Sequence, residues 1–142
     1  LSFTKKKQAD PLLEYLLQFR SRMGQARQLL TDSGRTAFFF VTLPEALPIA
    51  VITRFIGWFQ DFGIPVGGVV VNMLLDRQAI GSNVPEFVLN RMRMQDEHME
   101  TIWEKFDGSV RAIVPLFDQE LRGVEMLRRA SGALFGDAAP HA

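Results

Sequence analysis

The sequence contains no cysteine and only two histidines among its 142 residues. Without cysteine the chain can form no disulfide bond and no thiolate metal site, which fits a reducing compartment such as the cytoplasm. His98 and His141 have no companion at the spacing of a metal site, so we expect no bound metal. Sixteen basic residues balance sixteen acidic ones, and basic and aromatic residues do not interleave. We therefore expect no nucleic-acid partner.

Long hydrophobic runs and nucleotide-binding motifs are also missing. The longest uncharged run, Phe62 to Leu75, is interrupted by glycine and proline and is too short to span a bilayer. No G-x-x-x-x-G-K-[ST], G-x-G-x-x-G or G-x-S-x-G motif occurs, so we assign no catalytic residue to this chain. The chain begins at Leu1 rather than at methionine, which suggests a piece of a longer protein.

Three apolar stretches predict buried β-strands: residues 37–42, 66–72 and 110–114. Helices are predicted before, between and after them: from Asp10-Pro11 to Thr31, from Leu47 to Gly63, from a cap at Asn83 to Phe106, and from a cap at Asp118 to about Phe135. Alternating helices and strands predict one doubly wound α/β unit over residues 1–142 with at least three parallel strands. Residues 1–9 and 136–142 are expected to be disordered.

The first predicted helix has one apolar stripe, whose members are spaced by four, three, four, three and four residues: Leu12, Leu16, Phe19, Met23, Ala26 and Leu30. Such a stripe more often packs on a sheet, which is the interpretation we favour. The alternative is a hydrophobic surface that binds a client or a partner helix.

The ends of the predicted strands offer candidate ligand contacts. Glu45 follows the first strand, Asn72 ends the second, and Pro115 to Phe117 follow the third. In an open parallel sheet these ends share one edge, where ligands bind. An asparagine amide can pair with adenine by accepting from N6 and donating to N7. An asparagine after a strand is more often a turn former, so spacing alone indicates only a possible ligand edge.

Four segments, in this order and spacing, resemble the carboxyl-terminal half of the ArsA-type ATPases, a deviant P-loop family that includes arsenite pumps and tail-anchored-protein-targeting ATPases. The segments are residues 40–47, 68–75, 94–95 and 115–123. The similarity extends from Leu30 to Leu134. It implies that the chain forms half of a larger P-loop NTPase sheet, at the carboxyl-terminal end of the ATPase domain.

The resemblance also implies a nucleotide site and partners. In the family, the matching residues contact ATP, recognise adenine or form the loop around it: Glu45, Asn72, Pro115, Leu116, Phe117, Asp118, Gln119, Glu120, Leu121 and Arg122. Mg²⁺ and phosphate binding belong to an amino-terminal half. The implied partners are that half, a second copy in a homodimer, and a membrane-protein client or membrane partner. The absence of cysteine from Asp76 to Val84 does not support the zinc staple of the targeting members.

A hypothesis of another class remains open. The segment could be a non-enzymatic α/β module that binds a protein partner through its apolar helix and its sheet edge. A phosphate-binding loop upstream in the full reading frame would favour the ATPase.

Overall fold

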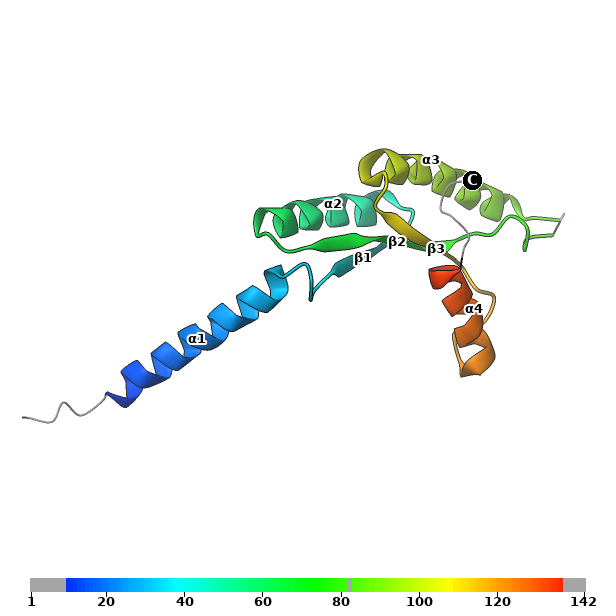
Figure 1. Cartoon of the computed structure of the whole chain (residues 1–142). Coiled ribbons are helices and arrows are strands. Elements are labelled where there is room, and N and C mark those ends of the chain that lie inside the picture. Colours follow the sequence, from blue (N-terminus) through cyan, green and yellow to red (C-terminus); the bar gives the residue numbers. More distant parts are fainter. Residues whose placement is uncertain (1–9, 82, 137–142) are drawn as a thin grey trace, which may run out of the picture.

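The structure, a computed structural model, describes residues 10–81 and 83–136 (Figure 1). Its elements, in chain order, are α1 (Pro11–Thr31), β1 (Phe38–Thr42), α2 (Ala46–Asp61), β2 (Val66–Leu74), α3 (Glu86–Phe106), β3 (Val110–Pro115) and α4 (Gly123–Phe135). The predicted disorder of residues 1–9 and 137–142 lies outside the described residues.

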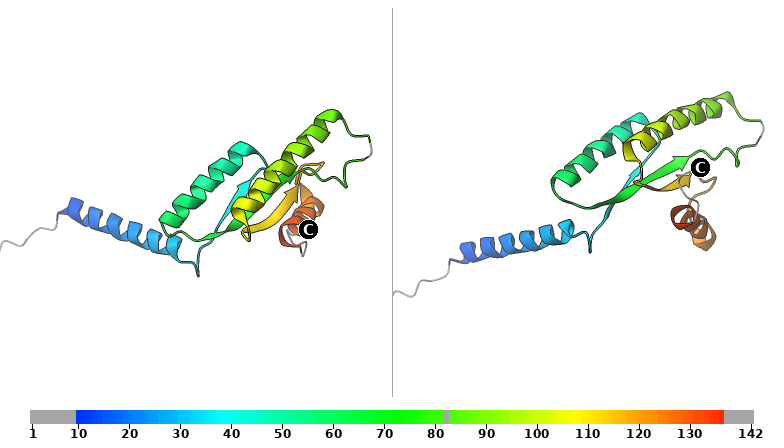
Figure 2. Two further views of the ribbon diagram at one scale, coloured as in Figure 1. Left: turned by 90° about the horizontal axis from the view of Figure 1, so that it is seen from above. Right: turned by 45° about the horizontal axis from the view of Figure 1, so that its top comes forward.

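The three strands form one parallel sheet in the order β1-β2-β3. Helices α2 and α3 lie on one face of this sheet, and α4 lies on the other face beside β3 (Figures 1 and 2). The predicted α/β fold with helices on both faces is therefore confirmed. β2 is central because its uninterrupted valines suit a strand that is covered on both faces.

The hydrophobic core lies between the sheet and the two helices α2 and α3. Val69 and Val71 of β2 and Ile102 of α3 are fully buried there. The ring of Phe59 in α2 packs edge-on against Phe38 and Phe40 of β1, with ring centroids 4.9 and 5.1 Å apart. Edge-on aromatic pairs add to the stabilisation from area burial, so β1 is anchored to α2 from this face.

Helix α1 does not pack on the sheet, and that prediction is wrong. The helix buries no residue and projects away from the sheet (Figure 1). Its beginning is as predicted, because the side chain of Asp10 accepts a hydrogen bond from the Leu12 amide at 3.0 Å. At its other end the Thr36 hydroxyl donates to the Leu29 carbonyl at 2.7 Å, which ties the connection to β1 to the last turn.

The predicted starts of the last two helices are also wrong. Asn83 does not cap α3: Pro85 holds the cap position and no side chain caps the helix. Asp118 does not cap α4, which begins at Gly123 instead. Gly123 has a φ of 77°, a left-handed conformation that ends the preceding loop and that glycine adopts most readily.

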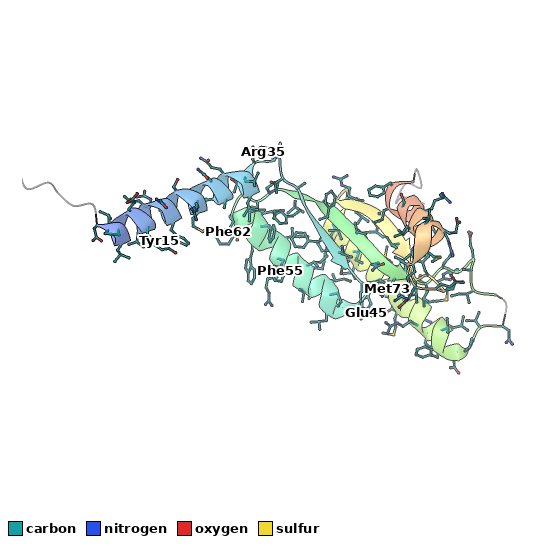
Figure 3. The ribbon with its side chains drawn as sticks, turned by 90° about the horizontal axis from the view of Figure 1, so that it is seen from below. Tyr15, Arg35, Glu45, Phe55, Phe62 and Met73 are labelled. Carbon is teal, nitrogen blue, oxygen red and sulfur yellow. The ribbon has the colours of Figure 1, made fainter. Side chains whose placement is uncertain are left out.

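The buried face of α4 differs from the predicted one as a consequence. Met126 and Ala130 are buried, whereas Val124 and Leu127 are exposed. In α2, Phe55 was expected in the core but lies on the outer side against Trp58 (Figure 3), with ring centroids 5.2 Å apart. None of the described helices is long and apolar enough to cross a membrane.

β2 extends to Leu74, beyond the loop start predicted at Met73, and its end contains a bulge. The register with β3 shifts between Val71 and Leu74, and Met73 has a φ of 60°. A positive φ is unfavourable for a residue with a long side chain. Some other contact must therefore stabilise this backbone.

The side-chain amide of Gln95 provides that contact from α3. It donates to the Met73 carbonyl at 3.0 Å and accepts from the Leu75 amide at 2.9 Å. Gln95 is buried among Met92, Met99 and other apolar residues of α3. One side chain thus satisfies two backbone groups at the end of β2 and fixes where that strand ends. We call this contact the Gln95 clamp.

Replacing Gln95 with leucine should destabilise the protein by about 2 to 4 kcal/mol, because the Met73 carbonyl and the Leu75 amide would both lose their partner away from water. Urea unfolding measures this change. The matched control is Gln78→Leu in the exposed loop, whose side chain makes no such contact. Equal midpoints for the two variants would contradict the clamp.

A second expected cost concerns Gly68, which has a φ of 149°. A Cβ atom there would lie 2.4 Å from Cγ of Arg111 and 2.6 Å from the Ser109 carbonyl oxygen. Gly68→Ala should therefore lower the free energy of unfolding by about 2 kcal/mol or more. Gly57→Ala in α2, where nothing lies within 4 Å, should instead raise it by about 0.5 to 1 kcal/mol. The opposite order in thermal unfolding would refute this account.

Candidate functional site

The carboxyl ends of the three strands meet at one edge of the sheet, as predicted. Thr42 of β1 pairs with Val71 of β2, and Leu74 of β2 pairs with Pro115 of β3. The Leu116 amide then donates to the Leu74 carbonyl at 2.8 Å. The residues after each strand therefore emerge side by side, and we call this edge the strand-end rim.

Glu45 lies at the rim on the side of α2 and α3. It occupies the cap position of α2 without capping the helix by its side chain. Its carboxylate instead forms an ion pair with Arg91 of α3. Figure 3 shows Glu45 near Met73 at this end of the sheet. Since both partners of the pair are more than a third exposed, the pair adds little stability and can open at low cost.

A pocket of about 450 Å³ opens beside this ion pair. Glu45 and Leu116 line it, together with the apolar residues Leu43, Pro44 and Phe87. The pocket thus brings together two of the predicted site residues, one after β1 and one after β3. Asn72 does not line it.

Asn72 is half-buried near the end of β2. Because side chains alternate along a strand, Asn72 lies on the face opposite Val71 and hence opposite the core of α2 and α3. Its Oδ1 accepts a hydrogen bond from the Met73 amide at 3.0 Å. The end of β2 therefore separates Asn72 from Glu45, and the two residues do not share one pocket.

The loop after β3 connects the rim to α4. Phe117 is half-buried under the guanidinium of Arg129, which lies 5.4 Å from the ring centroid. Asp118 pairs with the same arginine at 3.5 Å, so α4 stabilises the first half of this loop from one side chain.

The second half of the loop faces solvent. Glu120 and Arg122 form an exposed ion pair at 2.8 Å, and Gln119 and Leu121 are exposed beside them. Surface pairs of this kind contribute little to stability. The loop from Pro115 to Arg122 therefore has an anchored start and a more open end.

Sequence analysis missed Gln95 and Arg91 as residues that organise the rim. A signal for Gln95 was present, because it interrupts the apolar stripe of α3 between Met92 and Met99. A polar residue inside an apolar stripe indicates a buried polar contact. Arg91 was interpreted as part of a solvated surface, and nothing in its local sequence indicates Glu45 as its partner.

The rim offers amide, carboxylate, guanidinium and apolar groups, which suit recognition of a polar flat ligand better than metal binding. Within residues 10–81 and 83–136, no three histidine, aspartate or glutamate side chains form a group able to hold a metal ion.

The model of one protein family, described as the anion-transporting ATPases (ArsA), matches residues 1–136. Among curated proteins, the chain is 31% identical to ATPase GET3 of Chaetomium globosum over 125 residues, which is 88% of this chain and 36% of that protein. It is 28% identical to ATPase GET3B of Arabidopsis thaliana over 128 residues, covering 89% of this chain and 30% of that protein.

A bacterial relative gives the same result. The chain is 25% identical to the putative arsenical pump-driving ATPase 1 of Aquifex aeolicus over 122 residues, covering 86% of this chain and 31% of that protein. The chain thus spans about a third of the length of these relatives. Because the family model covers nearly the whole sequence, the chain belongs to the ArsA family of anion-transporting ATPases.

Proposed function

We propose that this chain is the adenine-binding portion of an ATP-hydrolysing ATPase. The observation that supports this most is the strand-end rim, where Asn72 and the loop from Pro115 emerge from neighbouring strands whose register is Leu74 opposite Pro115. Parallel α/β sheets bind their ligands at this edge. Family membership adds that the proteins resembling this chain are named as ATPases.

Asn72 is proposed to recognise the base. Its Oδ1 already accepts one hydrogen bond from the Met73 amide, but an amide oxygen has two lone pairs. The second lone pair can accept from adenine N6 while Nδ2 donates to N7. The bond to Met73 holds the amide in one orientation before the base arrives, which lowers the entropy cost of binding.

The loop from Pro115 to Arg122 is proposed to cover the adenine. Pro115 and Leu116 would contact the flat face of the base, while Phe117 and Asp118 are held by Arg129. The residues from Gln119 to Arg122 are exposed and would close over the base from outside. Glu45 would contact the nucleotide or a facing subunit after leaving Arg91, an exposed pair that opens at low cost.

The activity of a whole protein is a further part of this proposal. Residues 1–142 would form one α/β unit at the carboxyl-terminal end of the ATPase domain. Phosphate and Mg²⁺ would be bound by an amino-terminal half that contains a P-loop, since this sequence has none. A homodimer that couples ATP hydrolysis to anion transport or to a membrane-protein client, in the cytoplasm, completes the proposal.

The surface of β1 supports a larger sheet. Its outer edge has no partner strand among the described residues, and Phe39 and Val41 are exposed on the face away from α2. An uncharged aromatic edge strand is prone to aggregate unless another strand pairs with it. The same surface would serve the second candidate function, a non-enzymatic module that binds a protein.

Asn72→Ala should weaken binding of ATP or adenosine about 5-fold to 30-fold, since it removes a paired hydrogen-bond contact worth about 1 to 2 kcal/mol. Amide chemical shifts of the protein during titration with adenosine measure this, with the largest changes expected at Asn72 and Leu116. The control is Asn90→Ala, on the exposed side of α3. Adenosine that moves no signal at the rim would favour the binding module.

A further inference from the structure

The exposed stripe of α1 has the spacing of a coiled-coil seam. Its six residues, spaced by four, three, four, three and four, occupy the two apolar positions of nearly three heptads: Leu12, Leu16, Phe19, Met23, Ala26 and Leu30. The five large members are between 41% and 64% exposed. No described element covers them, although the stripe runs along the whole helix (Figure 2).

A helix of this kind requires a partner for stability. An isolated helix of about this length is marginal in water, and Gly24 at its middle weakens it further. Most helix stability in proteins comes from burial of an apolar face, and α1 buries none in this structure. The first two turns are apolar nearly all round, since Leu13, Tyr15 and Leu17 flank the stripe there.

The charges beside the stripe indicate the kind of partner. At about 100° per residue, Arg20 and Arg27 lie on one flank of the stripe and Arg22 lies on the other. The one acidic residue of the helix, Glu14, lies on the opposite side. The seam of α1 is therefore bordered by arginines alone over its last three turns. Charges at these flanking positions select the partner and orientation of a coiled coil.

A second copy of this chain fits the seam poorly. In a parallel pair, Arg22 of one helix would face Arg27 of the other, because these are the flanking positions that meet across such an interface. In an antiparallel pair the flanks again offer only arginine to arginine. Like charges in these positions are destabilising and select against the wrong partner. An uncharged apolar segment would fill the stripe but would leave the three arginines without partners.

We propose that α1 binds an amphipathic helix that presents an apolar heptad stripe bordered by aspartate or glutamate. The apolar residues would supply most of the affinity, and the acidic borders would pair with Arg20, Arg22 and Arg27 and fix the register. This surface is distinct from the strand-end rim, and binding there does not depend on adenine recognition.

Three helical peptides of equal length test the proposal against the whole chain. All have leucine at the seam positions, and the flanking positions are glutamate, lysine or serine. Fluorescence anisotropy should show the glutamate peptide binding about tenfold or more tightly than the lysine peptide, because three attractions replace three repulsions. Raising salt from about 50 to about 500 mM should reduce this preference.

Two double variants with the same change in net charge supply the matched control. Arg20→Gln with Arg27→Gln removes both charges of one flank, and should weaken binding of the glutamate peptide about threefold to fivefold. Gln25→Glu with Gln28→Glu makes the same change on the far side of the helix, and should alter binding less than about twofold. Circular dichroism checks that helix content is unchanged in both.

Several results would overturn the proposal. The glutamate and lysine peptides could bind equally, or none of the peptides could bind. The serine peptide could bind as tightly as the glutamate peptide, which would indicate an uncharged apolar client. Sedimentation could show the chain pairing with itself through α1, with Leu16→Asp abolishing the pairing, which would indicate a second copy.

Discussion

The Gln95 clamp is the contact on which the strand-end rim depends. β2 is the one strand that pairs on both sides, so its position sets the ends of β1 and β3. Its last residues include a left-handed Met73, whose backbone would be unfavourable without support. Gln95 supplies two hydrogen bonds around that residue from a buried position in α3. The same helix turn region supplies Arg91, which reaches Glu45 after β1. Helix α3 therefore organises two of the three strand ends.

The end of β2 also divides the rim into two sides with different chemistry. On the side of α3, Glu45 and Leu116 line a pocket with a charged pair at its border. On the side of α4, Asn72 and the anchored start of the loop at Phe117 lie against a face that is otherwise open at β1. A base on the Asn72 side and a mobile carboxylate on the other side would allow one strand end to respond to both. This division is a property of the backbone alternation in β2, not of any single side chain.

Much of the fold could be predicted from local patterns, and the failures have physical causes. The strands were predictable because runs such as Phe38 to Val41 are buried or paired whatever surrounds them. The start of α4 was not, because Asp118 has the chemistry of a helix cap but pairs with Arg129, a partner distant in sequence. The packing of α1 was also misjudged, since an apolar stripe shows that a partner is needed without showing which one. At the rim, Glu45, Asn72 and Pro115 were predicted to share an edge and do so, whereas the Gln95 clamp depends on a contact between residues twenty positions apart.

Amide hydrogen exchange at the rim tests the central claim most directly. If the clamp and the β2–β3 register hold the strand ends, the amides of Leu75 and Leu116 should exchange about as slowly as that of Val69, because each donates a hydrogen bond at 2.8 to 2.9 Å. Exchange at Leu75 and Leu116 as fast as at Gly81 in the following loop would show that the strand ends are not held, and the site proposed at the rim would then have no fixed frame.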